Sequence, residues 1–231
     1  MGAAVGWGAL SASSLVLGAL LGLRGGWSDR RVGLVLAFGA GALISAVSFE
    51  LVEEGGNVGA PGWLGLGLAS GALVYFAADR FVERRASGGG TSLALGAFLD
   101  GIPEQLVLGI SIAGGAGVSV GLLAAIFVSN LPEAIGSATE MRAGGSSPAR
   151  IRRLWIGVAA VCTAATVVGY AIADATGGNL QGAIDGFAAG ALLVMLSDSM
   201  IPDAREKAGR VAGLVTVLGF AVAAALSGVS T

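Results

Sequence analysis

Eight continuous apolar runs make up most of the 231 residues and limit what this chain can fold into. A helix needs about 20 apolar residues to cross the hydrocarbon layer of a membrane. The runs lie at about residues 3–23, 32–51, 61–78, 92–113, 118–138, 154–173, 181–201 and 211–229. They do not alternate apolar and polar residues, as the strands of a membrane β-barrel would. We therefore expect an all-α fold, a bundle of eight transmembrane helices forming one domain over residues 1–231.

The composition supports a membrane protein and excludes several other classes. Only 12% of the residues are charged, against about 25% in soluble domains, and the mean hydropathy is +0.83. A soluble enzyme, a nucleic-acid-binding protein and a disordered chain are excluded, and the single Cys162 rules out a disulfide scaffold. No basic residue precedes Arg24, so we interpret the first run as a retained helix rather than a cleaved signal peptide.

The basic residues predict the orientation of the bundle. All 13 Lys and Arg residues lie in alternate connections: Arg24, Arg30, Arg31, Arg80, Arg84, Arg85, Arg142, Arg150, Arg152, Arg153, Arg205, Lys207 and Arg210. The positive-inside rule places these four connections in the cytoplasm and both termini outside. The expected location is the plasma membrane. Glu50, Glu53 and Glu54 then lie at or near the outer face, either as a cation entrance or simply as exterior acids.

Two of the runs resemble each other. Residues 38–43 and 187–192 are similar at an offset of 149, and Ser48 then matches Ser197. The two runs are expected to cross the membrane in opposite directions. They therefore suggest an inverted repeat of 3+2+3 helices, a symmetry on which many transporters are built. Chance similarity between Ala/Gly-rich helices is the alternative.

The fourth and fifth runs contain polar residues that are costly in lipid. Asp100 and Glu104 are four residues apart and share one helix face, while Asn130 and Glu133 are three apart on the next helix. A charged group in mid-membrane costs several kcal/mol and is by default a candidate functional residue. The short connection between the runs and a rise of about 1.5 Å per residue predict that the four groups lie at similar depths.

Each of these runs also contains a proline, at Pro103 and Pro132. Proline has no N–H to donate, so helix kinks are expected there, with the carbonyls of Leu99 and Val128 left free. Carbonyls beside carboxylates form an oxygen-rich site. We predict a metal site of Asp100, Glu104, Asn130 and Glu133, with Ser129 and Gln105 as weaker candidates. The alternative is a set of neutral, hydrogen-bonded acids that hold two helices together; Gln105 itself could face the ion pathway or make a helix contact.

These features resemble the ZIP (zinc–iron permease) transporters. That family has eight spans, outward termini, a His-Asn-x-Pro-Glu-Gly motif in span 4 and a related Pro-Glu motif in span 5. The matching residues here are Pro103-Glu104, Pro132-Glu133 and Asn130. The resemblance extends over the whole chain in outline, and it implies transport of divalent metal cations toward the cytoplasm by alternating access.

The chain departs from the family pattern because it has no histidine. Asp100 stands where the first histidine would be, Gly101 replaces the following Asn, and Ser129 replaces the second His. Carboxylate and carbonyl oxygens favour harder ions than imidazole does. The expected transported cation is therefore Zn, Mn, Fe or Mg, with no prosthetic group.

The resulting prediction is a metal-ion transporter, and two alternatives stay open. One is a non-transporting membrane scaffold or sensor of the same fold. The other is an intramembrane enzyme, which we do not expect because histidine-based catalytic arrangements cannot form. Expected partners are the lipid bilayer and metal ions, with a homodimer as a further assembly to consider and no nucleic acid.

Overall fold

The computed structural model describes residues 1–85, 90–114 and 118–226, and these residues form helices joined by short connections. The elements are α1 (Gly2–Arg24), α2 (Asp29–Ala46), η1 (Val47–Glu53), α3 (Glu54–Val58), α4 (Pro61–Arg85), α5 (Gly90–Ala113), α6 (Val120–Ala143), α7 (Pro148–Asp174), α8 (Asn179–Met195), η2 (Leu196–Met200), α9 (Ile201–Ala208) and α10 (Val211–Leu226). The all-helical prediction is confirmed over the described residues.

Six helical segments in the described part of the chain are long and apolar enough to cross a membrane. They are Gly2–Arg24, Asp29–Val58, Pro61–Val82, Val120–Ala143, Pro148–Asp174 and Asn179–Ala208. The fourth predicted run lies on α5, and the eighth lies on α10, a shorter apolar helix. Residues 227–229 of the eighth predicted run lie outside the described residues.

The second and seventh helices are longer than predicted. The α2, η1 and α3 segments form one rod, and α8, η2 and α9 form another; η1 and η2 are π-helical. The first rod ends at Gly59, where the backbone becomes extended, and the second at Gly209, whose φ is 68°. Glu53 and Glu54 consequently lie on the first rod rather than in a connection. Polar residues near the run ends hid this continuation in the sequence.

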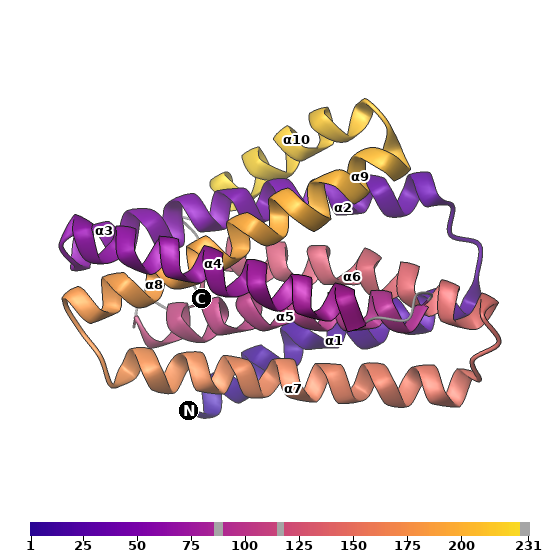
Figure 1. Ribbon diagram of the computed structural model, residues 1–231, viewed down its shortest axis with the longest axis horizontal. Helices are drawn as coiled ribbons and strands as arrows, with labels where there is room; N and C mark the ends of the chain where they lie inside the picture. Colours follow the sequence, from indigo (N-terminus) through magenta and orange to yellow (C-terminus); the bar gives the residue numbers. More distant parts are fainter. Residues whose placement is uncertain (86–89, 115–117, 227–231) are drawn as a thin grey trace.

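The helices form two groups, one above the other in Figure 1. The lower one, here the motif group, contains α1, α5, α6 and α7. The upper one, here the flanking group, contains α2, η1, α3, α4, α8, η2, α9 and α10. In the motif group, α1 packs against α6 and α7, and α5 packs against the same two helices. In the flanking group, α2 packs against α10 and α8 against α4, with α8 also contacting η1 and α3. The groups meet where α2 packs along α6, and a Cβ added at Gly39 would lie 2.9 Å from the Ser129 Cα.

Glycines let the helix backbones of the flanking group approach closely, as small residues do in membrane bundles. A Cβ on Gly71 of α4 would lie 1.9 Å from the carbonyl oxygen of Phe187 on α8. One on Gly41 of α2 would lie 1.8 Å from that of Thr216 on α10. These distances are too short for any side chain, so the pairs α4–α8 and α2–α10 require glycine at the contact.

The connections separate to the two ends of the bundle (Figure 1). Connections 25–28, 144–147 and 209–210 lie at one end, and connections 59–60 and 175–178 lie at the other. The first set borders the basic residues used above for orientation. Helix α1 begins, and α10 ends, at the end opposite to that set.

Candidate metal-ion site

The candidate site lies on α5 and α6, which pack against each other in the motif group. Both helices continue through their internal prolines, Pro103 and Pro132. Ser119 caps the start of α6 by accepting a hydrogen bond from the backbone N–H of Leu122. Because proline donates no backbone hydrogen bond, each helix has a carbonyl four residues earlier without its usual partner.

Glu104 is the buried centre of this contact. Its side chain is 1% exposed, and its Oε1 accepts a hydrogen bond of 2.8 Å from Ser129 Oγ on α6. The sequence predicted that Glu104 and Asn130 lie at similar depths on neighbouring helices, and the structure brings Glu104 into contact with Ser129, the residue before Asn130. Ser129 thus holds one oxygen of Glu104 and leaves the other available.

Several other buried polar atoms in the described part of the chain have no hydrogen-bond partner. They are Glu104 Oε2, Asn130 Nδ2 and Oδ1, Glu133 Oε2 and, away from the motifs, Trp155 Nε1. The Asn130 amide lies beside the Glu104 carboxyl and interacts with it, but without the geometry of a hydrogen bond. An unpartnered buried polar group costs about 1–3 kcal/mol. Three of the four predicted metal ligands therefore carry unpaired oxygens inside the bundle, which is a donor set suited to a divalent cation.

Charge in this region is predominantly negative. Asp100, Glu104 and Glu133 lie close enough for their charges to repel one another if all were ionised. The structure also places Lys207 of α9 within electrostatic range of Glu133. The Lys207 Nζ forms a salt bridge of 3.2 Å with Oδ2 of Asp203, which lies on the same helix. Because Lys207 is paired with Asp203, it does not neutralise the three acids, and a bound cation would relieve the repulsion among them.

Asp100 differs from Glu104 because its hydrogen-bond partner lies outside the two motif helices. The Tyr75 hydroxyl of α4 donates a hydrogen bond to Asp100 Oδ1, and both side chains are buried, at 4% and 7% exposure. Sequence reasoning missed Tyr75 because it considered the fourth and fifth runs alone. A signal existed: a buried tyrosine hydroxyl usually needs a partner.

The predicted ligands do not form a closed coordination shell in this conformation. Among the described residues, no three His, Cys, Asp or Glu side chains lie near enough to hold one metal ion. Glu104 and Ser129 are brought together, whereas Asp100 bonds to the flanking group instead. Asn130 points its amide oxygen toward α5, 3.8 Å from a Cβ built on Gly101.

Gln105 joins two neighbouring helices, one through its amide oxygen and the other through its amide nitrogen. It accepts a hydrogen bond of 2.7 Å from Thr166 Oγ1 on α7 and donates one of 3.0 Å to Ser11 Oγ on α1. The side chain is fully buried. This geometry fits the helix-contact alternative stated for Gln105.

The acids predicted as a cation entrance lie along the first rod. Glu50 accepts a hydrogen bond from Ser119 of α6, Glu53 is exposed, and Glu54 Oε1 lies 3.5 Å from a Cβ built on Gly114. Asp185 of α8 lies near these acids: it interacts electrostatically with Glu54 and accepts a hydrogen bond of 2.9 Å from Gln181.

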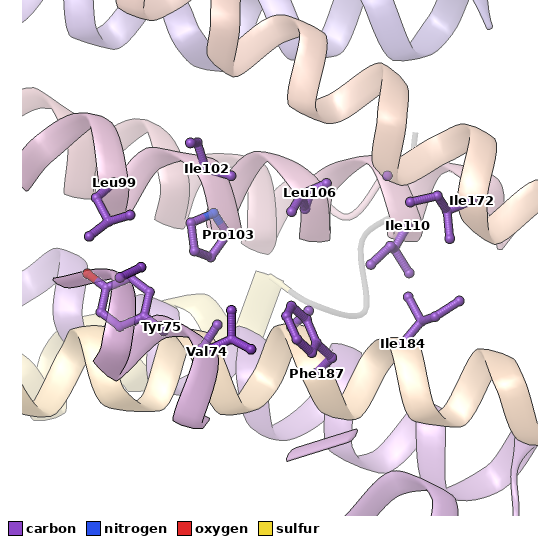
Figure 2. Close-up of a pocket in the computed structure, with 14 residues that line it drawn as sticks. Val74, Tyr75, Leu99, Ile102, Pro103, Leu106, Ile110, Ile172, Ile184 and Phe187 are labelled. Carbon is purple, nitrogen blue, oxygen red and sulfur yellow. The ribbon is translucent and has the colours of Figure 1, made fainter. Parts of the chain in front are cut away.

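An apolar cavity of about 300 Å³ lies beside the site, between α4 and α8 on one side and α5 and α7 on the other. Figure 2 shows Pro103 and Leu106 facing Val74 and Phe187 across it. Tyr75 stands at one end of this cavity, and Ile172 and Ile184 stand at the other (Figure 2).

Comparison with known proteins shows one informative similarity. No protein-family model matches the chain. A curated protein of Arabidopsis thaliana named "Putative zinc transporter" is 30% identical over 201 residues, which cover 80% of this chain and 32% of that protein. The chain thus spans about a third of the length of this relative. The similarity covers most of the helical bundle described above.

Proposed function

We propose that this chain is a transmembrane transporter of divalent metal cations, similar to the ZIP proteins. The observation that carries the proposal is the set of unpartnered buried oxygens on Glu104, Asn130 and Glu133. Oxygen donors of this kind can replace the hydration shell of a hard or borderline cation. The similarity to a protein named as a zinc transporter supports the same class.

The proposed path runs from the acidic end of the bundle toward the basic end. Glu50, Glu53 and Glu54 would concentrate cations at the outer face. Asp100, Glu104, Asn130 and Glu133 would then hold the dehydrated ion, which leaves toward the cytoplasm. In this proposal the chain crosses the membrane eight times, with both termini outside the plasma membrane.

The proposed inverted repeat has support at the level of packing. The two π-helical segments begin at Val47 and, 149 residues later, at Leu196. Ser48 donates to the carbonyl of Ile44, and the matching Ser197 donates to that of Leu193, each at 2.8 Å. The contact of α2 with α10 corresponds to that of α8 with α4. A repeat relating the first three spans to the last three predicts the matching π-helical segments, the matching serine hydrogen bonds and the matching helix contacts.

The metal specificity follows from the ligand types. Without histidine, the proposed site offers carboxylate and amide oxygens, so Mn²⁺, Fe²⁺ and Mg²⁺ are reasonable substrates. Zn²⁺ also accepts carboxylate ligands. A flux panel of Zn, Mn, Fe, Mg and Ca on the protein in proteoliposomes decides between these ions.

The same panel tests the site when it is applied to Glu104→Gln and Glu133→Gln. Each substitution keeps the side-chain size and removes one negative charge, so we expect at least a ten-fold loss of flux. Glu140→Gln, on an exposed position of α6, serves as the matched control and should transport like the wild type. Flux that persists in both site variants would show that the ion takes another path.

A membrane scaffold of the same fold is the second candidate. It is favoured by the hydrogen bonds of Glu104 with Ser129 and of Asp100 with Tyr75, which join helices of the bundle directly. A scaffold predicts that the purified protein moves none of the five ions. It also predicts that Glu104→Gln and Glu133→Gln lower the melting temperature, while neither the wild type nor the variants transport metal.

A further inference from the structure

Hydrogen bonds and close packing make each helix group a unit of its own. In the motif group, Gln105 joins α5 to α1 and α7, and Ser129 joins α6 to Glu104. In the flanking group, Gly71 and Gly190 bring α4 and α8 into backbone contact: a Cβ on Gly190 would lie 2.1 Å from the Leu68 carbonyl oxygen. Moving helices within either group would break these contacts.

The packing between the two groups is less complete than the packing within each group. The apolar cavity lies on this boundary, where α4 and α8 face α5 and α7 (Figure 2). Apart from Tyr75, the side chains that line this cavity carry no polar group, so they can slide past one another without losing hydrogen bonds. Elsewhere on the boundary α2 packs directly against α6; along the cavity, the polar contacts that cross the boundary hold the groups in register.

Tyr75 makes such a crossing contact. Its backbone belongs to α4 of the flanking group, and its hydroxyl bonds to Asp100 on α5 of the motif group. The Glu50–Ser119 bond also crosses, from η1 to the start of α6. In both cases the acceptor is a carboxylate that the proposed ion path uses.

We propose that Tyr75 is a positioning residue for the ion site: its hydroxyl holds Asp100 Oδ1 against the flanking group, and an arriving cation competes for that oxygen. This inference rests on the proposed function. When the ion takes Asp100, the phenol loses its acceptor and the tie between the two groups is released. The cation class is the one proposed above, a divalent metal ion bound through oxygen.

Competition predicts a specific kinetic effect for Tyr75→Phe. The variant keeps the ring that lines the cavity and removes only the hydroxyl, so Asp100 is free before the ion arrives. We expect the KM for the transported metal to fall about three- to ten-fold, while the maximal rate does not rise. Tyr170→Phe removes the only other tyrosine hydroxyl of the chain and serves as the matched control with an unchanged KM.

A structural role alone would have a different signature. If Tyr75 only stabilised the bundle, Tyr75→Phe would lower the melting temperature and the amount of active protein, but the KM would stay the same. An unchanged or raised KM in the folded variant would overturn the proposal.

A spectroscopic measurement separates this proposal from the transport proposal. In Tyr170→Phe protein with isotope-labelled tyrosine, Tyr75 gives the single labelled phenol band in the infrared. Adding zinc should shift this band as the bond to Asp100 breaks, and manganese is measured in parallel. The doubly substituted Tyr75→Phe, Tyr170→Phe protein provides the blank.

The combined outcomes are distinct. No flux in the wild type, together with a metal-dependent shift of the Tyr75 band, would reject transport and keep the competition at Asp100. Flux in the wild type, without a shift and without a change in KM, would reject the role of Tyr75 and keep transport. No flux and no shift would reject both.

Discussion

Single polar residues in this bundle differ in whether they have partners, and in the proposed transporter that difference separates structural positions from ion-binding ones. Gln105 and Glu104 are adjacent and equally buried. Gln105 bonds through both ends of its amide, whereas Glu104 keeps one oxygen unpartnered. In lipid a polar group without a partner is expensive, and the unpartnered oxygens of Glu104, Asn130 and Glu133 are the ones that the proposed ion would use.

Gln105→Leu should therefore reduce stability rather than ion affinity. The change removes two buried hydrogen bonds, each worth about 0.6–2 kcal/mol in a membrane. We expect a lower melting temperature in detergent and an unchanged KM for the transported metal in the protein that remains folded. A KM raised ten-fold or more would instead place Gln105 in the ion pathway.

At the scale of the elements, backbone geometry determines where the helices touch. The π-helical segments η1 and η2 lie within the two rods of the flanking group, and η2 brings Met200 to within 3.0 Å of a Cβ built on Gly39. Segments of π-helix are frequent at functional sites. Beside them, the glycine contacts let α4 approach α8, and α2 approach α10, more closely than larger residues would allow.

A pair of substitutions on α4 tests the importance of these contacts. Gly71→Ala places a methyl group 1.9 Å from the Phe187 carbonyl oxygen, so α4 and α8 must separate. Overpacking of this kind costs about 1–3 kcal/mol. Gly65→Ala on the same helix has nothing within 4 Å of its new Cβ and should be neutral or slightly stabilising. Equal melting temperatures for the two variants would contradict the packing described here.

At the scale of the whole molecule, charge is distributed between the two ends of the bundle. Connections that border basic residues lie at one end, and the acids Glu54 and Asp185 lie toward the other. Cytoplasmic connections carry an excess of Lys and Arg in membrane proteins. The bundle should therefore sit with the end containing 144–147 in the cytoplasm.

Labelling of introduced cysteines with a membrane-impermeant maleimide tests this orientation. Gly177→Cys, between α7 and α8, should react in intact cells, and Ala143→Cys, at the end of α6, should react only after permeabilisation. The wild type is the control, because its single Cys162 is fully buried and should stay unlabelled. The reverse labelling pattern would invert the proposed direction of transport.

The sequence alone predicted the parts of this protein that depend on local chemistry. Apolar runs of fixed length indicated the helices, since a membrane requires both apolar side chains and internally bonded backbone. The i, i+4 spacing placed Asp100 and Glu104 on one face of α5, and the short connection placed Glu104 beside α6. The rods at 29–58 and 179–208 were underestimated because hydropathy falls before the backbone helix ends.

Only the tertiary structure decided which of the polar groups have partners. Tyr75 precedes Asp100 by 25 residues and Gln105 follows Ser11 by 94, and no local pattern links residues so far apart. Whether a buried oxygen meets a hydroxyl or remains free depends on how neighbouring helices pack. Composition and spacing therefore indicated that the bundle lies in lipid and on which helices its oxygens are, and packing determined which of these oxygens have hydrogen-bond partners.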